Sequence, residues 1–545
     1  MFKFSIVIPT RARADTLIHA LTTAVEQTFS DIEIIVHESG DDPHTAGAVA
    51  AVGDSRTRHV KTGHPVSMTK NWELALNSAT GDYITFLGDD DGLTNDACAV
   101  ASSILEREPA ELLSWRPLAY YWPLYVVEAR RNRLEGAIGP AVVERKSSAL
   151  ILELFYRFRE DYSHLPMVYN SFVKRTVIER VRDKMGCYFV GGAPDICSGI
   201  VNAFCSESFL LSGRPLSVSG LSHNSTGHRI YFSKDRVKRD EAARDAFDTL
   251  RLHPSLVQSN NLKLFIGNEM LIVKESLFPE EEPGFRITDL LDATAQALQF
   301  GPDDYDESLS DIREVAALNG IDIGDLAIPP RHDGALSPPQ GVRALGPDAL
   351  LIDIDCTQAG VENVRDAARL LQALMPLAGE QPVIVTGEVV RTLPSLNGEG
   401  FRVDFTHTGN GVFFLGSGWG ESEPWGTWTI ASRAAIRMRT ERRDDKPFKI
   451  DIRGQMFISG PMQNPRGSVR LNGGVSVPFA ATSEQPNVVI HLVASPEVAL
   501  DREIVLEFEI ERPVSPAEEG IGLDTRRLGF GLKAIEFAMK TGDAQ

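Results

Sequence analysis

Three consecutive aspartates, Asp89 to Asp91, follow an apolar stretch that ends at Leu87, and glycines flank them on both sides. Adjacent carboxylates repel one another. A divalent cation bound with a diphosphate would relieve that repulsion, because Mg²⁺ and Mn²⁺ prefer oxygen ligands and commonly keep substrate phosphates in their shell. Asp-rich turns are also common as solvated surface turns, which is the alternative. The segment is therefore a candidate metal site.

A second acidic group stands far from this turn in the sequence. Asp195 follows Gly191-Gly192-Ala193-Pro194 and opens an apolar run with helical character. A carboxylate in that position can take the proton from an attacking hydroxyl group as a general base. Aspartate also caps helices, and one residue can serve both purposes. Asp161 and Asp183 are weaker candidates for the base.

Two further polar groups could contact a phosphate or a metal. His223 and His228 lie in the turn-rich stretch from Gly220 to His228 and are candidate metal ligands, although a lone histidine is more often structural. Lys70 and Asn71 stand at the start of a predicted helix, where contact with a phosphate and simple solvation are equally favoured.

An aromatic segment follows the acidic turn. Sugar rings stack on aromatic side chains, so these residues could form a platform for a sugar, but alternating aromatics in a strand more often pack a core. The residues are Trp115, Tyr120, Tyr121, Trp122 and Tyr125.

The elements that must position these groups alternate between strand and helix. A strand at Ser5–Ile8 ends at Pro9-Thr10, a strand at Ile32–Val36 leads to Glu38, and a strand at Asp82–Leu87 leads to the acidic turn. Such alternation predicts a mostly parallel sheet with helices on both faces, and ligands bind at the carboxyl ends of its strands. We therefore expect Thr10, Glu38 and the acidic turn to converge.

The rest of the chain predicts two further parts. Residues 255–330 have the pattern of helices with acidic or Pro-rich breaks, a proline-rich linker follows, and a short strand and helix occupy 349–374. Short β-rich runs between Gly, Pro and Asn then suggest a sandwich. We predict an α/β catalytic domain at 1–254, a helical extension with linker and strand–helix unit at 255–378, and an all-β sandwich at 379–545.

Composition limits the partners of the chain. Its 545 residues carry 55 Lys and Arg against 75 Asp and Glu, a formal net charge of -20, which disfavours binding to nucleic acid. Five cysteines without C-x-x-C spacing indicate reduced thiols in a cytoplasmic protein. No secretory signal is expected at the N-terminus, and no apolar stretch reaches the roughly 20 residues that a membrane span needs.

Three segments carry a resemblance to a known family. Phe4–Arg11, Gln27–Val36 and Gly81–Asp91 together resemble the inverting family 2 glycosyltransferases with a GT-A (Rossmann-like) fold, over roughly residues 1 to 230. The resemblance implies a nucleotide-sugar donor, with a UDP-sugar favoured, and a divalent metal, Mn²⁺ or Mg²⁺, on a DxD-type motif. Glu38 stands where the family usually has Asp, and Gly88 stands where many members carry the first acid.

The resemblance also implies roles for individual residues. It makes Asp195 the catalytic base. The residues implied for the donor are Pro9, Thr10, Arg11, Glu38, Lys70, Asn71 and Asp89, and those implied for the metal are Asp90, Asp91 and His223.

The acceptor expected from the resemblance is a glycan or a lipid-linked glycoconjugate of bacterial surface polysaccharide synthesis. Cytoplasmic location, with peripheral contact to the inner membrane left open, follows from that expectation, and the sequence leaves oligomerisation open. The cluster Trp419, Trp425 and Trp428 resembles β-sandwich modules appended to bacterial polysaccharide glycosyltransferases. Carbohydrate binding and a purely structural role are both open for this module.

Two alternative functions remain at this stage. Asp353-Ile354-Asp355-Cys356-Thr357 matches the nucleophile motif of haloacid-dehalogenase-like phosphatases, but the expected downstream lysine and second acidic loop are not seen. A noncatalytic carbohydrate-binding protein on a transferase scaffold is the other alternative, and the presence of both Asp90 and Asp195 argues against it.

Overall fold

The structure, a computed structural model, describes most of the chain. The residues it describes are 2–139, 141–225, 252–298, 305–326, 328–329, 331, 341–346, 349–378, 383–388, 392–393, 401–406, 411, 414–415, 418–423, 425–440, 448–459, 464–494, 503–516, 519, 521 and 526–539. Contacts divide the chain into two compact units. The first is Met1–Leu326 with Arg331–Glu388, and the second is Ala327–Pro330 with Val389–Gln545.

A nine-stranded sheet forms the centre of the first unit, in the order β15-β9-β11-β6-β10-β4-β1-β2-β3. Its strands are β1 (Phe4–Thr10), β2 (Ile32–Glu38), β3 (Thr57–Lys61), β4 (Tyr83–Phe86), β6 (Leu112–Trp115), β9 (Val142–Ser147), β10 (Ser171–Lys174), β11 (Ser208–Ser212) and β15 (Val383–Glu388). Strands β1 to β4 are parallel, and β10 enters antiparallel between β4 and β6. The carboxyl ends of β1, β2 and β4 therefore share one edge.

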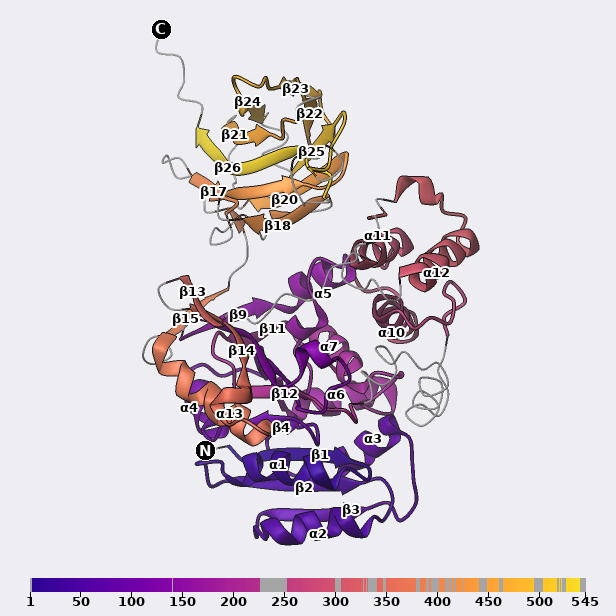
Figure 1. The fold of residues 1–545 in the computed structure, drawn as a ribbon, viewed down its shortest axis with the longest axis vertical. Helices are drawn as coiled ribbons and strands as arrows, with labels where there is room; N and C mark the ends of the chain where they lie inside the picture. The colour runs from indigo at the N-terminus through magenta and orange to yellow at the C-terminus, as the bar shows by residue number, and fades with distance from the viewer. Residues whose placement is uncertain are drawn as a thin grey trace. The chain divides into compact units, whose positions relative to one another are not determined.

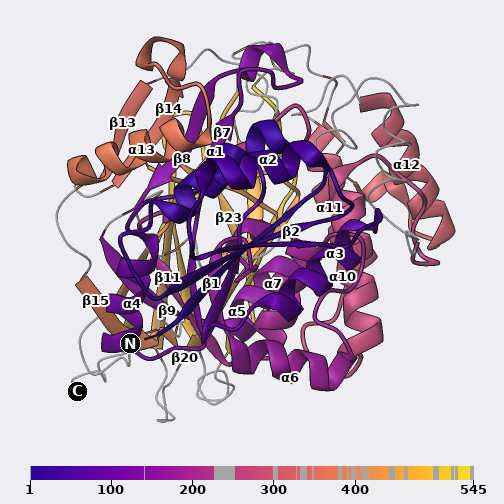
Figure 2. The same ribbon diagram turned by 90° about the horizontal axis from the view of Figure 1, so that it is seen from below.

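Helices cover both faces of this sheet (Figures 1 and 2). The core on one face includes α1 (Ala14–Val25) and α4 (Ala97–Arg107), and α2 (Pro43–Val52) packs on α1. The helices on the other face are α3 (Met68–Ser78), α5 (Ser148–Tyr156), α6 (Arg175–Met185) and α7 (Pro194–Phe204). Figure 2 shows α1 and α2 on one side of β1 and β2, with α6 and α7 on the other.

A six-stranded sheet lies in the same unit, in the order β13-β14-β8-β7-β12-β5. Its strands are β13 (Gly341–Gly346), β14 (Ala349–Asp355), β8 (Arg133–Ile138), β7 (Leu118–Tyr121), β12 (Ser217–Leu221) and β5 (Gly92–Leu93). Helix α13 (Val364–Leu374) buries its apolar face against this sheet, and Arg365 pairs with Glu26 at the end of α1. The strand and helix expected near residues 349–374 thus pack onto the first unit.

Three helices extend the first unit: α10 (Leu262–Leu277), α11 (Ile287–Ala297) and α12 (Tyr305–Leu318). Asn261 caps α10 by accepting hydrogen bonds from the N–H groups of Lys263 and Leu264. Helix α10 packs directly on α7, and this contact bears on the candidate site. Short 3-10 helices are η1 (Glu128–Arg130), η2 (Tyr162–His164), η5 (Ile323–Asp325), η6 (Cys356–Ala359) and η7 (Met375–Ala378).

In the described part of the second unit, β16 (Thr392–Leu393) pairs in parallel with β20 (Arg433–Thr440), and the other strand pairs are antiparallel. One sheet contains β16, β20, β25 (Glu503–Ile510), β22 (Arg466–Leu471) and β23 (Val477–Ala480). The other contains β18 (Trp419–Glu423), β19 (Gly426–Thr429), β26 (Phe530–Met539), β21 (Phe448–Met456) and β24 (Asn487–Ala494), with β17 (Phe401–Asp404) paired to β26. Burial alternates along β21 and β24, as expected when one face of a sheet covers a core.

The core of the second unit draws on both sheets. Ile436, Leu506 and Phe508 come from the first sheet, and Ile452 and Ile535 come from the second. This arrangement is that of two sheets packed face to face. The predicted fold class is confirmed: an α/β sheet domain with a helical extension, followed by a strand-rich region consistent with a β-sandwich.

Candidate functional site

The predicted convergence of three strand ends is present. Thr10 lies opposite Glu38 in the parallel register of β1 and β2, and Val7 lies opposite Phe86 in the register of β1 and β4. The residues that follow β4 therefore come level with the end of β1. The Thr10 hydroxyl donates a hydrogen bond of 2.7 Å to Asp89 Oδ2, which joins the two strand ends directly.

Asp89 is held by an arginine as well as by Thr10. Arg13 Nη1 lies 3.0 Å from Asp89 Oδ1, and the Asp89 side chain is almost fully buried. Burial raises the pKa of Asp89 above its ordinary value, because the pull of Arg13 and Thr10 does not fully offset the loss of water and the charge of Asp90. For Arg13, burial lowers the pKa, but Asp89 and Asp90 outweigh it and leave a net rise. Asp89 is thus a buried ion-pair partner.

Asp90 is bound by the loop that follows β12. Its Oδ2 atom accepts hydrogen bonds from the hydroxyl groups of Ser222 (2.7 Å) and Ser225 (2.5 Å). The indole N–H of Trp122 donates to the backbone carbonyl of Asp90 at 3.1 Å. Because the hydroxyl donors gather on Oδ2, Oδ1 is the oxygen of this carboxylate that can accept a cation.

The Asp91 carboxylate is bound by backbone N–H groups of its own loop and of β12. Its Oδ2 atom accepts from the N–H of Gly88 at 3.1 Å, and its Oδ1 atom accepts from the N–H of Gly220 at 2.7 Å. Burial, followed by the charge of Asp90, raises the pKa of Asp91 well above its ordinary value. A Cβ atom on Gly88 would lie 2.6 Å from Asp91 Oδ2, so the space for an acid at position 88 is taken by the Asp91 carboxylate.

Glu38, the last residue of β2, is fully buried at this edge of the sheet. Its Oε2 atom is 2.8 Å from His59 Nε2, and its Oε1 atom accepts a hydrogen bond from the N–H of Asp42. Pro9 is buried within β1, while Arg11 is exposed just beyond it. Glu38 therefore sits with its carboxylate engaged on both oxygens.

The two residues predicted at the start of α3 differ from each other. Asn71 is buried, with its Oδ1 atom 2.8 Å from His37 Nδ1 and its amide donating to the His37 carbonyl at 3.3 Å. Lys70 is exposed one residue earlier. The structure thus joins Asn71 to the end of β2 and leaves Lys70 in solvent.

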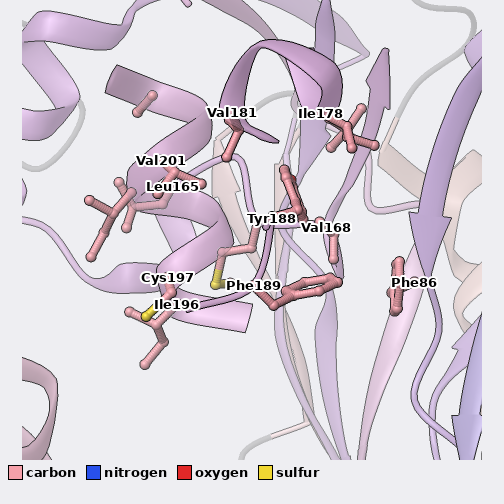
Figure 3. Close-up of a cluster of buried hydrophobic side chains, with 14 of the residues drawn as sticks. Phe86, Leu165, Val168, Ile178, Val181, Tyr188, Phe189, Ile196, Cys197 and Val201 are labelled. Carbon is pink, nitrogen blue, oxygen red and sulfur yellow. The ribbon is translucent and has the colours of Figure 1, made fainter. Parts of the chain in front are cut away.

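Asp195 lies in the first turn of α7, directly after Pro194 at the helix start. The Ser198 hydroxyl donates to the Asp195 carbonyl at 2.5 Å and accepts from the N–H of Val168 at 3.1 Å. The Val168 carbonyl in turn accepts from the N–H of Phe86 at 2.9 Å, at the end of β4. Figure 3 shows Phe86, Val168 and Ile196 in the same buried cluster. The helix that carries Asp195 is therefore anchored to the strand that leads into the acidic turn.

Asp195 and the acidic turn both influence the pKa of one buried tyrosine. The pKa of Tyr169 is raised well above its ordinary value, first by burial and then by the charges of Asp91, Asp195, Asp90 and Asp89. Burial is also the main cause that raises the pKa of Asp195. The charges of both acidic groups that the sequence predicts thus act on the same buried side chain.

His223, one of the two histidines predicted as metal ligands, contacts its neighbour in the sequence. His223 Nε2 lies 2.9 Å from the side-chain amide of Asn224. His228, the second candidate, lies outside the described residues. Within the described ranges, no group of three or more His, Cys, Asp or Glu side chains could hold a metal ion by itself. A cation at Asp90 would therefore need oxygens from a bound diphosphate and from water, which Mg²⁺ sites commonly use.

The side chains of the aromatic segment are buried, and the two aspartates of the phosphatase-like motif make local contacts. The core interpretation of the aromatics is confirmed, because all five side chains are buried: Trp115, Tyr120, Tyr121, Trp122 and Tyr125. Asp353 pairs with Arg133 of the neighbouring strand β8 at 2.7 Å, and Asp355 accepts from the N–H of Thr357 at 2.9 Å. These two aspartates belong to a strand end within the six-stranded sheet.

The tryptophans of the second unit divide into two kinds. Trp419 and Trp428 are buried, and Trp425 is half-buried. Trp425 donates its indole N–H to Glu423 at 2.8 Å, and a Cβ atom on Gly531 would lie 2.4 Å from its ring. Trp425 thus lies against strand β26 at a position that only glycine leaves open.

Sequence reasoning missed four residues of this arrangement. Arg13, Ser222 and Ser225 contact the acidic turn, and Glu269 contacts the turn before Asp195. The polar run Ser222-His223-Asn224-Ser225 was a usable signal for the two serines, and the position of Arg13 just past Thr10 was another. Glu269 lies within a helix of the extension, and no local pattern points to it.

Comparison with known proteins finds a family match in the N-terminal segment. Residues 5–172 match the family model described as glycosyl transferase family 2. A stretch of 100 residues is 31% identical to the GalNAc(5)-diNAcBac-PP-undecaprenol beta-1,3-glucosyltransferase of Campylobacter jejuni, covering 18% of this chain and 32% of that protein. The match thus spans about a third of the length of this curated relative.

Solved structures show distant likeness. S. aureus TarS residues 1–349 in complex with UDP-GlcNAc is 12% identical, with a TM-score of 0.32 over 61% of this chain and 98% of that one. Full-length S. aureus TarS is 9% identical, with a TM-score of 0.34 over 99% and 86%. The mannosyltransferase PcManGT of Pyrobaculum calidifontis, in complex with GDP-Man and Mn2+, is 15% identical, with a TM-score of 0.29 over 58% and 86%. TM-scores at this level carry no weight for function.

The described residues include no helix that is both long and apolar enough to cross a membrane. The segment that matches the glycosyl transferase family 2 model, residues 5–172, contains Thr10, Glu38 and the acidic turn but not Asp195.

Proposed function

We propose that this chain is an inverting, metal-dependent glycosyltransferase that moves a sugar from a nucleotide-sugar donor to a hydroxyl group of a glycan or lipid-linked acceptor. The observation that carries the proposal is the junction of strand ends, where Thr10 binds Asp89 and the helix of Asp195 is anchored to the end of β4. The family match over residues 5–172 supports the reaction class. The lipid-linked acceptor rests on the name of the C. jejuni relative, of which a third is matched.

The donor site in this proposal uses the carboxyl ends of β1 and β2. Glu38 is buried at the end of β2 and held by His59, and it is the acidic residue proposed to face the nucleotide base. Arg11 is exposed just beyond β1, and its positive charge would favour a diphosphate bound at this edge. The residues proposed for the donor are Pro9, Thr10, Arg11, Glu38, Lys70, Asn71 and Asp89. A UDP-sugar is the favoured donor.

The residues present fit a divalent cation that is shared with the donor. Asp90 is buried with its Oδ2 atom bound by two serine hydroxyls, which leaves Oδ1 for a metal such as Mn²⁺ or Mg²⁺. Asp91 and His223 are the further ligands proposed. A metal bound here would offset the charge that develops on the departing diphosphate.

The proposed reaction is a single displacement with Asp195 as the base. The acceptor hydroxyl loses its proton to the Asp195 carboxylate while its oxygen bonds to the anomeric carbon. The bond from that carbon to the diphosphate breaks, and the nucleoside diphosphate leaves with the electron pair. Attack from the face opposite the leaving group inverts the anomeric configuration.

The experiment incubates the full chain with UDP-glucose, UDP-GlcNAc, UDP-galactose or GDP-mannose in the presence of Mn²⁺. Release of the nucleoside diphosphate is measured with water or added glycans as acceptor, and NMR identifies the first anomer formed. We expect release from one donor with formation of the β-anomer from an α-linked donor. Release with the α-anomer formed first would contradict inversion, and no release from any donor would contradict the transferase assignment.

A further inference from the structure

A buried carboxylate contacts the turn that precedes Asp195. Glu269 of α10 is 1% exposed. Its Oε2 atom accepts hydrogen bonds from the N–H groups of Gly192 (2.8 Å) and Ala193 (3.4 Å) and lies 3.3 Å from the Cys197 thiol. The amide of Asn268 donates to its other oxygen at 3.3 Å. The Glu269 side chain thus contacts both the turn before α7 and a side chain in the first turn of α7.

The turn is shaped around this carboxylate. Gly191 has a φ of +76°, and a Cβ atom at this position would lie 2.1 Å from Glu269 Oε2. A glycine is required there both for the left-handed backbone and for the close approach of the oxygen. The Gly191 carbonyl also accepts a hydrogen bond of 3.0 Å from the Thr69 hydroxyl of α3. The path of the chain into Asp195 therefore depends on contacts from α10 and α3.

Burying a carboxylate is costly unless it is well paired, and no cation pairs with Glu269 in the described part of the chain. Burial raises the pKa of Glu269, while its hydrogen bonds with Cys197, Gly192 and Ala193 act against that rise. A neutral side chain could satisfy the same N–H groups at lower cost. A buried carboxylate is therefore energetically unfavourable at this position if the contact is purely structural.

Several titratable groups of the described residues lie around this turn. Besides Glu269 from α10, they include Tyr162 and Tyr169 from the segment around η2, Tyr156 from α5, and Cys197 from α7 itself. Burial raises the pKa of Asp195, and the nearby negative charge of Glu269 raises it further. Removing the Glu269 charge therefore weakens Asp195 as a proton acceptor.

We propose that Glu269 is a positioning residue for Asp195: it holds the Gly191–Ala193 turn in place and keeps a second negative charge beside the base. This inference rests on the proposed function, because it requires Asp195 to be the base. Glu269 takes no proton in the reaction. It acts only on the placement and the basicity of the Asp195 carboxylate.

The test compares two variants of the full chain, Glu269→Gln and Glu269→Asp, with Glu275→Gln as a control on the same helix. Glu275 is exposed and pairs with His253 at 2.8 Å. Nucleoside diphosphate release from UDP-glucose and UDP-GlcNAc is followed against pH. We expect Glu269→Gln to lower kcat at least about tenfold, as part of the roughly 10²- to 10⁴-fold worth of a general base. The donor KM should stay within about twofold, and the acidic limb of the profile should move to lower pH.

Glu269→Asp keeps the charge but shortens the reach, so kcat should fall with a smaller movement of the acidic limb. Glu275→Gln should match the wild type. A wild-type kcat and pH profile in Glu269→Gln would overturn the proposal. Failure of both Glu269 variants to fold would assign the residue to stability and would overturn it as well.

A double variant separates this inference from the proposed function. If Glu269 acts through Asp195, Glu269→Gln should cause little further loss in an Asp195→Asn background. An equal loss in both backgrounds would mean that Glu269 acts independently, and the inference would fail while the base assignment stood. Full turnover of Asp195→Asn alone would instead remove the proposed base.

Discussion

The three adjacent aspartates differ in what binds them. Asp89 is paired with Arg13 and Thr10, Asp91 is bound by two backbone N–H groups, and Asp90 is bound by serine hydroxyls on one oxygen. A carboxylate with a protein donor on each oxygen also serves the architecture of the loop. Asp90 is therefore the member of the turn best suited to a cation, although the sequence presents the three as equivalent.

The role of Asp195 can be tested by an amide of the same shape. Asp195→Asn should lower turnover by roughly 10²- to 10⁴-fold while donor affinity, measured by calorimetry, stays within about twofold. Because the pKa of Asp195 is raised above its usual value, wild-type activity should fall with decreasing pH at a higher pH than for an ordinary aspartate. Collapse of donor binding together with turnover would show that Asp195 only supports the helix start.

The sequence could predict the residues of the site that stand at strand ends. Thr10, Glu38 and Asp89 follow apolar strands, and parallel pairing brings such ends together regardless of the loops between them. Ser222, Ser225 and Glu269 reach the site from a later loop and from a separate helix. Their contacts depend on long-range packing that no local spacing encodes.

At the scale of elements, the acidic turn and Trp122 both lie very close to the backbone of β12 at Gly220. A Cβ atom on Gly220 would lie 1.7 Å from the Asp90 carbonyl oxygen and 2.8 Å from Trp122 Nε1. The strand and the turn can meet only because this position lacks a side chain. The sequence allowed Trp122 to be either part of a sugar platform or a core residue. Its indole N–H donates to the Asp90 carbonyl and so supports the same turn.

Gly220→Ala should separate the strand from the turn. We expect a loss of roughly 1–3 kcal/mol in the free energy of unfolding, measured by thermal denaturation, together with loss of metal-dependent donor binding. Gly47→Ala is the control, because that position in α2 has open space around it. Alanine in a helix should be neutral or stabilising there. Equal stability of the two variants would contradict the close approach.

Glu33 of β2 links two strands and gives a pH-dependent prediction. Burial alone would raise its pKa, but hydrogen bonds from Ser5 and Thr80 and the charge of Lys3 lower it to about 2. A depressed pKa stabilises the fold above the unfolded value near 4.5, and this stabilisation disappears as the pH falls toward 2. Its size is on the order of 3 kcal/mol.

Glu33→Gln should therefore be less stable than the wild type at pH 6, with the difference shrinking between pH 4.5 and pH 2. Urea unfolding of the full chain at several pH values measures it. Asp31→Asn, at an exposed acid just before β2, is the control for loss of one negative charge next to this strand. A constant difference across the range would show that Glu33 does not titrate with a depressed pKa.

The elements themselves were largely predictable, and their partners were not. Alternating burial in β21 and helical spacing in α1 follow from local periodicity. The antiparallel insertion of β10 between β4 and β6 depends on contacts between distant segments. The same is true of β14, which pairs with β8 more than two hundred residues earlier.

At the scale of the whole molecule, the chain carries two units with separate cores. The first unit holds every residue proposed for the transfer reaction, and β15 (Val383–Glu388) is its last strand. The second unit has its own two-sheet core. Its open question is whether the tryptophan cluster binds glycan.

Trp425 and Trp428 make a matched pair for that question. Trp428 is 8% exposed and packs edge-on against Phe457, so Trp428→Ala in the full chain should cost roughly 3–5 kcal/mol of stability. Trp425 is half-buried and held by Glu423, so Trp425→Ala should cost less stability and remove affinity for soluble oligosaccharides. Unchanged oligosaccharide binding in Trp425→Ala would assign the cluster to structure.

The most direct test of the central claim is thermal denaturation of the full chain with a panel of nucleotide sugars, with Mn²⁺ or with a chelator. A donor at 100 times its dissociation constant stabilises the protein by about 2.7 kcal/mol. We predict that one nucleotide sugar, with a UDP-sugar favoured, stabilises the wild type when Mn²⁺ is present, and that Asp90→Ala loses this stabilisation. Equal stabilisation of Asp90→Ala in the presence of chelator, or no stabilisation of the wild type by any nucleotide sugar, would contradict the account.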